Sequence, residues 1–253
     1  QRQMCIRDRH RTGHTATLVH DELVIFGGMC EGECTADLVI LHAVTSEWRE
    51  IQPLGSETPR PRLGHAACAI EPASQLWLFG GGDGRLLLGD VWTLDRDADE
   101  LSWRWESRSC AGKATGRMGH SLVHMPNNTL ISFGGFVKGV KGGYSTQVLL
   151  LDMHTLTWSE PQIRPRPEGA PALRGRLGHV ACVLGGGEAI LILGGSAGGE
   201  LLDEVLLLRT PADSGSLSLE LIQTTKDDDA MARPRAHGAV VHVPPYVLHF
   251  GGA

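Results

Sequence analysis

The chain has 253 residues, of which 42% are hydrophobic and 21% charged, so it can bury a core and is too apolar for intrinsic disorder. Its formal net charge of −6 gives no whole-chain basic footprint for nucleic acid, although it leaves room for a local basic patch. No stretch reaches the ~18 apolar residues of a membrane span, so we expect neither a nucleic-acid nor a membrane partner. The 33 glycines, well above the usual share of ~7%, predict many tight turns between short strands.

The first nine residues, QRQMCIRDR, differ in character from the rest of the chain. They lack the apolar centre of a signal peptide. They resemble a translated sequencing adapter more than natural protein. We therefore interpret residues 1–9 as a non-native leader and leave them out of the fold.

Five similar units follow, each opened by an Arg-x-Gly-His element. These are RTGH (11–14), RLGH (62–65), RMGH (117–120), RLGH (176–179) and a degenerate RAHG (235–238). Each is followed by an apolar run that ends in a glycine pair: VIFGG (24–28), WLFGG (77–81), ISFGG (131–135), LILGG (191–195) and LHFGG (248–252). Self-similarity at a period near 50 residues indicates a repeat architecture.

A third and a fourth segment complete most units. The third opens with Asp37, Asp90, Gln147 or Glu204, and the loop before Gln147 is three residues longer than the others. A tryptophan marks the fourth segment (Trp48, then Trp103 or Trp105, then Trp158), and the fourth unit has Leu219 and Leu221 there instead. Four apolar segments of ~5–7 residues, separated by turn residues, predict a four-stranded antiparallel blade.

The order R-x-G-H, apolar-F-G-G, D-apolar and W resembles the kelch repeat, and the resemblance covers almost everything from Arg11 to Gly252. It implies an all-β, kelch-type β-propeller with four complete four-stranded blades and half of a fifth. We expect blades near 11–51, 62–107, 117–160, 176–223 and 235–253, within a partial propeller over 10–253 that belongs to a six- or seven-bladed ring. The rest of the ring would then be missing, and the chain would expose two apolar edges.

Residues that recur in every blade are expected to be structural, because functional sites usually break symmetry. Each histidine would tie its blade to the next, and the arginines (Arg62, Arg117, Arg176, Arg235) would pair with backbone or carboxylates of adjacent blades, or else bind an acidic partner. A Cβ at the glycine pairs would obstruct the turning backbone. The structural set is Gly13, His14, Gly27, Gly28 and Trp48; Gly64, His65, Gly80, Gly81 and Trp103; Gly119, His120, Gly134, Gly135 and Trp158; Gly178, His179, Gly194 and Gly195; Gly251 and Gly252.

The features that do not repeat are the better candidates for binding. The loop from strand two to strand three and the linker between blades should emerge at the same end of a blade. In the third blade these are 137–147 and 161–176, which carry the candidate partner-binding residues Lys138, Lys141, Tyr144, Arg164, Arg166 and Arg174. The opposite end carries the acidic turns 21–22 and 95–100. The hypothesis is that the basic end captures an acidic segment of a partner protein; solvated surface is the alternative.

Enzyme motifs are scarce. The sequence has no P-loop, no G-x-S-x-G and no H-E-x-x-H. A resemblance to copper radical oxidases would require tyrosine ligands with a cross-linked cysteine, and Tyr144 and Tyr246 have no such cluster. Cys30 and Cys34 form the only close cysteine pair, without the second pair or histidines of a metal site.

We therefore assign no catalytic, cofactor-binding or metal residue and predict a cytoplasmic interaction scaffold or adaptor. The alternative is a propeller-fold enzyme or the regulatory part of one, for example a kelch-phosphatase or a metal-dependent propeller enzyme. The partner's identity does not follow from the sequence, because a fold does not imply a function.

Overall fold

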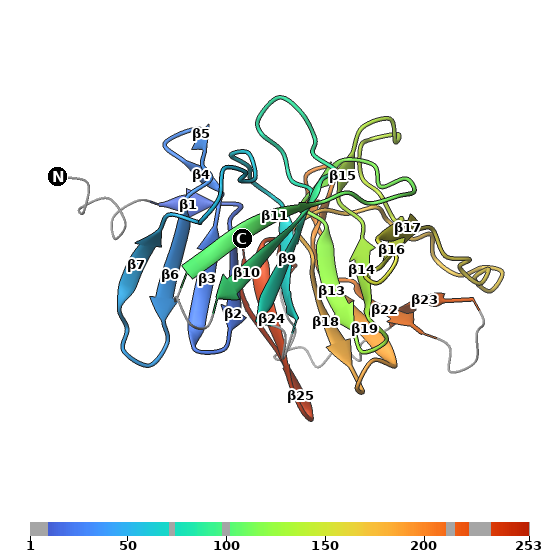
Figure 1. The fold of residues 1–253 in the computed structure, drawn as a ribbon. Coiled ribbons are helices and arrows are strands. Elements are labelled where there is room, and N and C mark those ends of the chain that lie inside the picture. Colours follow the sequence, from blue (N-terminus) through green and yellow to red (C-terminus); the bar gives the residue numbers. More distant parts are fainter. Residues whose placement is uncertain (1–9, 71–73, 98–101, 211–215, 223–233, 253) are drawn as a thin grey trace. The chain divides into compact units, whose positions relative to one another are not determined.

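A computed structural model describes residues 10–70, 74–97, 102–210, 216–222 and 234–252 of the chain (Figure 1). The predicted leader, 1–9, lies outside the described residues. Every regular element in the described part is a β-strand. Those residues accordingly hold no helix of the length and apolarity that a membrane span requires.

Four sheets each contain four antiparallel strands. Blade 1 is β2 (Thr15–Val19), β3 (Glu22–Phe26), β6 (Leu38–His42) and β7 (Trp48–Ile51); blade 2 is β8 (Ala66–Ile70), β9 (Gln75–Phe79), β10 (Val91–Asp97) and β11 (Ser102–Arg108); blade 3 is β13 (Ser121–Met125), β14 (Thr129–Phe133), β16 (Val148–Asp152) and β17 (Thr157–Ser159); blade 4 is β18 (Val180–Leu184), β19 (Ala189–Leu193), β22 (Val205–Arg209) and β23 (Ser218–Ile222). A half-blade pairs β24 (Gly238–Val243) with β25 (Tyr246–Gly251). The predicted all-β architecture of four blades and a half is confirmed, and the closed ring stays a prediction.

Short strands lie in the segments that connect the long ones. They are β1 (Arg11–Thr12), β4 (Met29–Cys30), β5 (Glu33–Cys34), β12 (Arg117–Met118), β15 (Phe136–Val137), β20 (Ser196–Ala197) and β21 (Glu200–Leu201). The linker before a blade meets that blade's loop between strands two and three: Leu63 bridges Gly82, and Leu177 bridges Ser196. Linkers and these loops therefore share one end of each blade.

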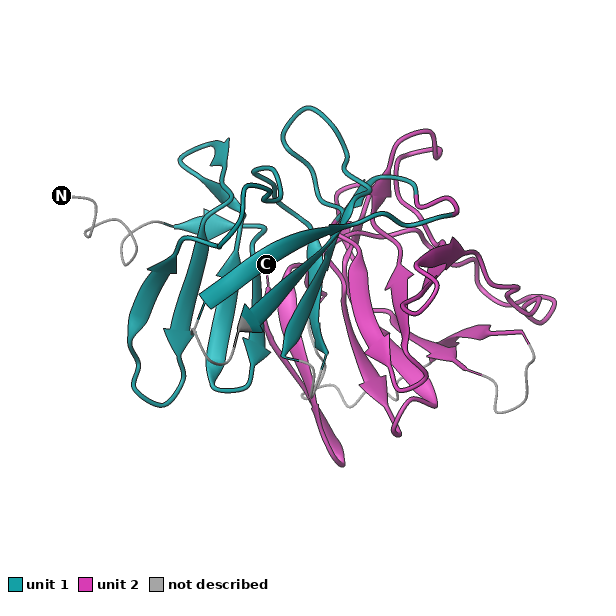
Figure 2. Cartoon of the chain, viewed as in Figure 1, with its two compact units in different colours: residues 1–111, 115–118 teal, residues 112–114, 119–253 magenta. Residues whose placement is uncertain are grey.

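The chain forms two compact units (Figure 2). Residues 1–111 and 115–118 contain blades 1 and 2, and residues 112–114 and 119–253 contain blades 3 and 4 and the half-blade. Each unit has its own packed interior.

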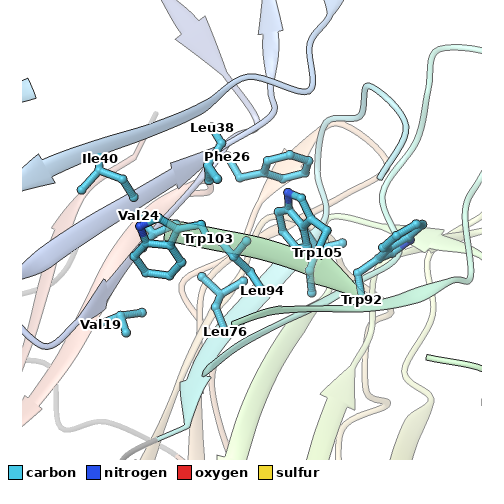
Figure 3. Packing of buried hydrophobic residues seen from close by; sticks show 11 residues of the cluster. Val19, Val24, Phe26, Leu38, Ile40, Leu76, Trp92, Leu94, Trp103 and Trp105 are labelled. Atoms are coloured by element: carbon cyan, nitrogen blue, oxygen red, sulfur yellow. The ribbon is translucent and has the colours of Figure 1, made fainter. Parts of the chain in front are cut away.

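The core of the first unit lies between the facing surfaces of blades 1 and 2 (Figure 3). Alternate residues of β3, such as Phe26, point into it, because successive side chains of a strand alternate between faces. Trp103 and Trp105 both enter this core from β11, and the Trp105 ring lies 4.8 Å from that of Phe26. The sequence offered either tryptophan as the repeat residue, and the structure buries both.

The core of the second unit is built the same way between blades 3 and 4. Phe133 and Val148 of blade 3 meet Ile192 and Leu206 of blade 4. Leu219 of β23, at the place of the repeat tryptophan, is buried in this core. A leucine can therefore replace the indole because the position only requires apolar volume.

One predicted packing residue behaves differently. Trp48 is 41% exposed, whereas Trp103 is 1% exposed. Trp48 pairs with Leu41, while the neighbouring pair of Ile40 and Arg49 lies on the other face of the sheet, where Ile40 enters the core. Trp48 is exposed because its face of blade 1 looks away from blade 2, and its structural role stays a prediction.

The half-blade has one apolar face that is largely exposed. Val241 pairs with Leu248, Val243 pairs with Tyr246, and these side chains share the face with Phe250, which is 82% exposed. On the other face, the His242 Nδ1 atom hydrogen-bonds with the Val183 carbonyl of blade 4 at 3.0 Å. The predicted exposed apolar surface is present on this half-blade.

Candidate functional site

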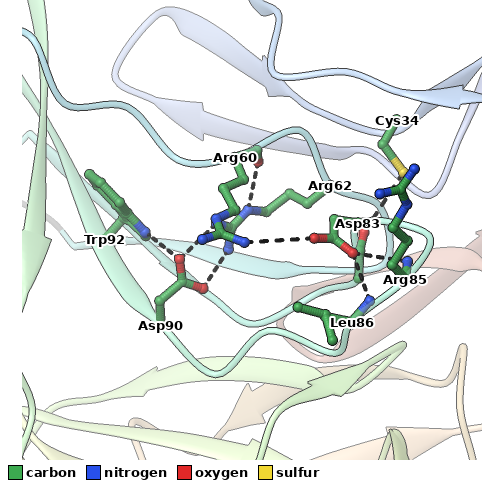
Figure 4. Close-up of polar contacts among 9 residues, drawn as sticks. Cys34, Arg60, Arg62, Asp83, Arg85, Leu86, Asp90 and Trp92 are labelled. Carbon is green, nitrogen blue, oxygen red and sulfur yellow. Dashed lines mark hydrogen bonds and ion pairs between the residues drawn. The ribbon is translucent and has the colours of Figure 1, made fainter.

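The recurrent arginine of blade 2 closes the end of its own blade (Figure 4). Arg62 is fully buried, and its Nη1 donates to the Gly80 carbonyl at 2.9 Å. Nη1 and Nη2 also donate to the two carboxylate oxygens of Asp90, each at 2.8 Å. Gly80 follows β9 and Asp90 precedes β10, so this bidentate pair ties strand two to strand three.

The charge of this pair is fixed by its surroundings. Burial by itself would raise the pKa of Asp90, but hydrogen bonds and charge from Arg62, together with a hydrogen bond from Trp92, hold it below its usual range. Asp90 is therefore ionised at neutral pH and compensates the buried guanidinium. This arginine has no charge left over for an acidic partner.

Blades 4 and 1 repeat this arrangement, but the contact between arginine and acid is longer in blade 1. Arg176 donates to the Gly194 carbonyl at 3.0 Å and pairs with Glu204. Arg11 donates to the Gly27 carbonyl at 3.0 Å, but its contact with Asp37 is long, at 3.5 Å. The expectation that these arginine side chains reach adjacent blades is thus wrong for blades 2 and 4, because each acid opens the third strand of the same blade.

Adjacent blades are joined instead by backbone. The Gly28 amide donates to the Arg62 carbonyl at 2.7 Å, and the same bond joins Gly195 to the Arg235 carbonyl at 2.9 Å. Gly27 has a φ of +63°, and a Cβ there would lie 2.8 Å from the Arg62 carbonyl oxygen. Glycine is required because its left-handed backbone sits directly against the neighbouring blade.

The recurrent histidines also join blades. His65 Nε2 hydrogen-bonds with the Thr15 hydroxyl at 2.9 Å, and His179 Nε2 with the Ser121 hydroxyl at 3.0 Å. The bond runs to the preceding blade, which corrects the expected direction. Burial, with the charges of Arg62 and His14 nearby, lowers the pKa of His65 to about 3. A neutral, buried, bonded imidazole is a structural group.

The extended loop and the linker of the third blade lie side by side. A Cβ on Gly175 would stand 2.2 Å from the Tyr144 carbonyl oxygen, and the Arg176 amide donates to the Ser145 carbonyl at 3.2 Å. Tyr144 is half-buried, with its ring edge-on to Phe136 at 6.0 Å. The predicted loop and linker therefore form one continuous surface.

The basic residues on that surface differ in what they contact. Lys138, Lys141 and Arg164 are exposed, and within the described part of the chain none of them forms an ion pair. Arg166 is half-buried and donates to the Pro171 carbonyl. Arg174 pairs with Glu200 and Glu204, both at 2.9 Å. Its charge is therefore already neutralised within the chain.

The acidic turns of the opposite end need a correction. Glu22 is only 3% exposed and pairs with Arg49 of blade 1 and, at 2.8 Å, with Arg96 of blade 2. It is a buried contact between blades 1 and 2, so the expectation of a solvated acidic turn is wrong there. Asp21 is exposed as expected, and residues 98–100 lie outside the described residues.

Sequence reasoning left out the acidic partners of the repeat. Asp90 and Glu204 open third strands in register, and that recurring acid was the signal that could have paired them with Arg62 and Arg176. Among the residues that the structure describes, no three His, Cys, Asp or Glu side chains come together as a metal site. The absence of a cofactor or metal stays a prediction.

The chain resembles known proteins over nearly its whole length. The KLHDC2/KLHL20/DRC7 kelch-repeats domain matches residues 13–252. Adagio-like protein 1 of Oryza sativa subsp. japonica is 33% identical over 214 residues, which cover 77% of this chain and 32% of that protein. Acyl-CoA-binding domain-containing protein 5 of Arabidopsis thaliana is 33% identical over 224 residues, or 88% of this chain and 32% of that protein.

A further relative is similar over a shorter region. Dynein regulatory complex subunit 7 of Chlamydomonas reinhardtii is 37% identical over 132 residues, which cover 51% of this chain and 11% of that protein. In all three comparisons, the aligned region spans about a third or less of the relative's own length.

Proposed function

The chain belongs to the kelch-repeat family, whose members are generally protein-interaction modules, and we propose that it acts as an adaptor that binds an acidic segment of a partner protein. The binding surface is the basic end of blade 3, which we define as Lys138, Lys141, Tyr144, Arg164 and Arg166. The observation that carries the proposal is the exposure of Lys138, Lys141 and Arg164, which form no ion pair with any described residue, on a loop and a linker that touch.

Two further observations support this assignment. The recurrent cations are already compensated, as Arg62 and Arg176 show, so the non-repeating residues supply the free positive charge. One relative is named as a subunit of the dynein regulatory complex, which fits a module that works within an assembly. Arg174, although a sequence candidate, is assigned to holding the linker through Glu204 instead. The free thiols at Cys30 and Cys34 fit the reducing cytoplasm as the proposed compartment.

Charge reversal tests the proposal. Changing Lys138, Lys141, Arg164 and Arg166 to Glu should abolish binding of a dye-labelled peptide of alternating aspartate and glutamate, measured by fluorescence anisotropy at low salt. The matched control reverses Arg85, Arg104, Lys113 and Arg209, which are exposed elsewhere and give the same change in net charge. If both variants lose the same affinity, the peptide senses only net charge and the proposed surface is wrong.

A further inference from the structure

A cavity of about 230 Å³ opens beside the basic end of blade 3. It is lined by Thr146, Gln147, Val148, Glu160, Pro161, Ile163, Leu173 and Leu219. These residues come from the end of the extended loop and the first residue of β16, the two stretches of linker on either side of 164–172, and β23. The cavity therefore lies where the interface between blades 3 and 4 reaches the surface.

The walls of the cavity are held by regular backbone contacts. The Arg164 amide donates to the Leu217 carbonyl at 2.8 Å, and the Leu217 amide donates to the Gln162 carbonyl at 3.0 Å. These bonds bracket Ile163 and set it parallel to Leu217, beside β23. Leu219 belongs to the core of the second unit, and Leu173 packs against it. Ile163 and Leu219 are thus held in place by backbone bonds and by core packing.

Size and polarity indicate what the cavity can hold. A volume of about 230 Å³ is below the roughly 300–1,000 Å³ of small-molecule sites, so it suits one side chain better than a whole ligand. Val148, Pro161, Ile163, Leu173 and Leu219 make the walls mainly apolar. At the polar rim, Gln147 Nε2 donates to a Glu160 carboxylate oxygen at 3.0 Å. An aliphatic side chain fits this lining.

The charge around the cavity selects the rest of the partner. Arg164 directly follows Ile163 in the linker and is exposed. Thr146 lies two residues after Tyr144, whose backbone carbonyl lies against Gly175. We propose that the cavity receives one aliphatic side chain of an extended acidic segment whose carboxylates contact Arg164, Lys138 and Lys141. This inference rests on the proposed function and adds to it the apolar residue that the partner must carry.

Selection from a displayed library of random peptides tests both ideas separately. On the full chain, selected peptides should be rich in Asp and Glu and should share one Leu, Ile, Val or Met. On the Thr146→Phe variant, which fills the cavity from an exposed position, the acidic preference should remain while the aliphatic preference disappears. On a variant with Lys138, Lys141 and Arg164 reversed to Glu, the acidic preference should disappear.

Binding of one selected peptide then gives the magnitude. Replacing its aliphatic residue with Ala should weaken binding to the wild-type chain about ten- to hundredfold, the range expected for burying one such side chain. The same peptide change should have little effect on Thr146→Phe. Ile163→Ser, which removes an apolar wall from the exposed linker, is the second variant and should act in the same direction. Thr155→Phe, an exposed threonine in the turn between β16 and β17, is the matched control.

Glu160 provides a test of the charge that the cavity favours in a bound peptide. Because its carboxylate lies at the rim of the cavity, Glu160→Gln should strengthen binding of an acidic peptide. If peptides selected on Thr146→Phe keep both the acidic and the aliphatic preference, the cavity assignment alone is overturned. If peptides selected on the wild-type chain show no acidic preference, the proposed function is overturned instead.

Discussion

Removing the charge of Asp90, the carboxylate partner of Arg62, should be among the single changes that most destabilise blade 2. The perturbation is Asp90→Asn, which keeps the shape of the side chain and removes its charge. Arg62 is 0% exposed and would keep its bond to the Gly80 carbonyl at 2.9 Å but lose its compensating charge. Removing one partner of a buried pair costs roughly 3–5 kcal/mol, because the other charge is left uncompensated.

Partial exposure reduces that figure. The Asp90 side chain is 35% exposed, so water screens part of the loss, and we expect the free energy of unfolding to fall by about 2–3 kcal/mol. Urea unfolding followed by tryptophan fluorescence measures it, since Trp92 and Trp103 lie in the same blade. The matched control is Asp37→Asn, where the pair is 3.5 Å long and the acid 46% exposed, so the cost should stay below about 1 kcal/mol.

The double variant Arg62→Met with Asp90→Leu separates charge from packing. It removes both charges together, so it should be less destabilised than Asp90→Asn alone. Equal destabilisation by Asp90→Asn and Asp37→Asn would refute the reasoning, because burial of the guanidinium would then make no difference.

Three further changes have distinct physical causes. Gly27→Ala should cost about 2–4 kcal/mol, because an alanine at φ +63° also meets a carbonyl oxygen 2.8 Å away, whereas Gly32→Ala, with open space around it, should cost only about 1 kcal/mol. Trp103→Ala should cost about 3–5 kcal/mol and Trp48→Ala about 1 kcal/mol or less, because only the first side chain is buried. The pKa of about 3 keeps the imidazole of His65 neutral in the folded chain, whereas in the unfolded chain it gains a proton below about pH 6.5. The free energy of unfolding should therefore fall as the pH drops below that value. His65→Gln should remove about 2 kcal/mol of this loss at about pH 5.

Unfolding by urea checks all three, and each has its own contrary outcome. Equal effects of the two glycine variants would show that contact with the neighbouring blade adds nothing to backbone strain. Equal effects of the two tryptophan variants would contradict the difference in burial between Trp103 and Trp48. A pH dependence that His65→Gln leaves unchanged between about pH 7 and pH 5 would mean that other groups set it.

The fold could be predicted because its determinants are local and repeated. The glycine pair of Gly27 and Gly28 recurs in every unit, its second glycine 14 to 16 residues after the histidine in the first four, and both glycines have a positive φ in each copy. The third strand of a blade reads as a continuous apolar run because it is covered on both faces, as Leu38, Val39 and Ile40 are. Period, turn residues and burial thus agree along the chain.

The electrostatic details could not be predicted, because they depend on which distant residues meet. Glu22 looks like a surface turn residue, yet Arg96, from a different blade, covers it. Arg174 looks like a free cation in a basic linker, yet Glu200 and Glu204 lie within 2.9 Å. Side chains 26 and 30 residues away neutralise it, and sequence spacing gives no sign of that.

The place where the repeat departs from its own pattern coincides with the proposed binding surface. Blades 1, 2 and 4 open their third strand with an acid, whereas blade 3 has Gln147. Its amide donates to Glu160 at the rim of the cavity, and the loop that leads to it is longer by three residues and carries Lys138 and Lys141. The repeated residues Arg62, Gly28 and His65 are occupied in joining strands and blades, whereas Gln147 departs from the repeat. Restoring the acid with Gln147→Glu should weaken binding of an acidic peptide, because a second carboxylate would then lie beside Glu160 at the cavity, while Asp90→Glu in the regular blade should leave that binding unchanged.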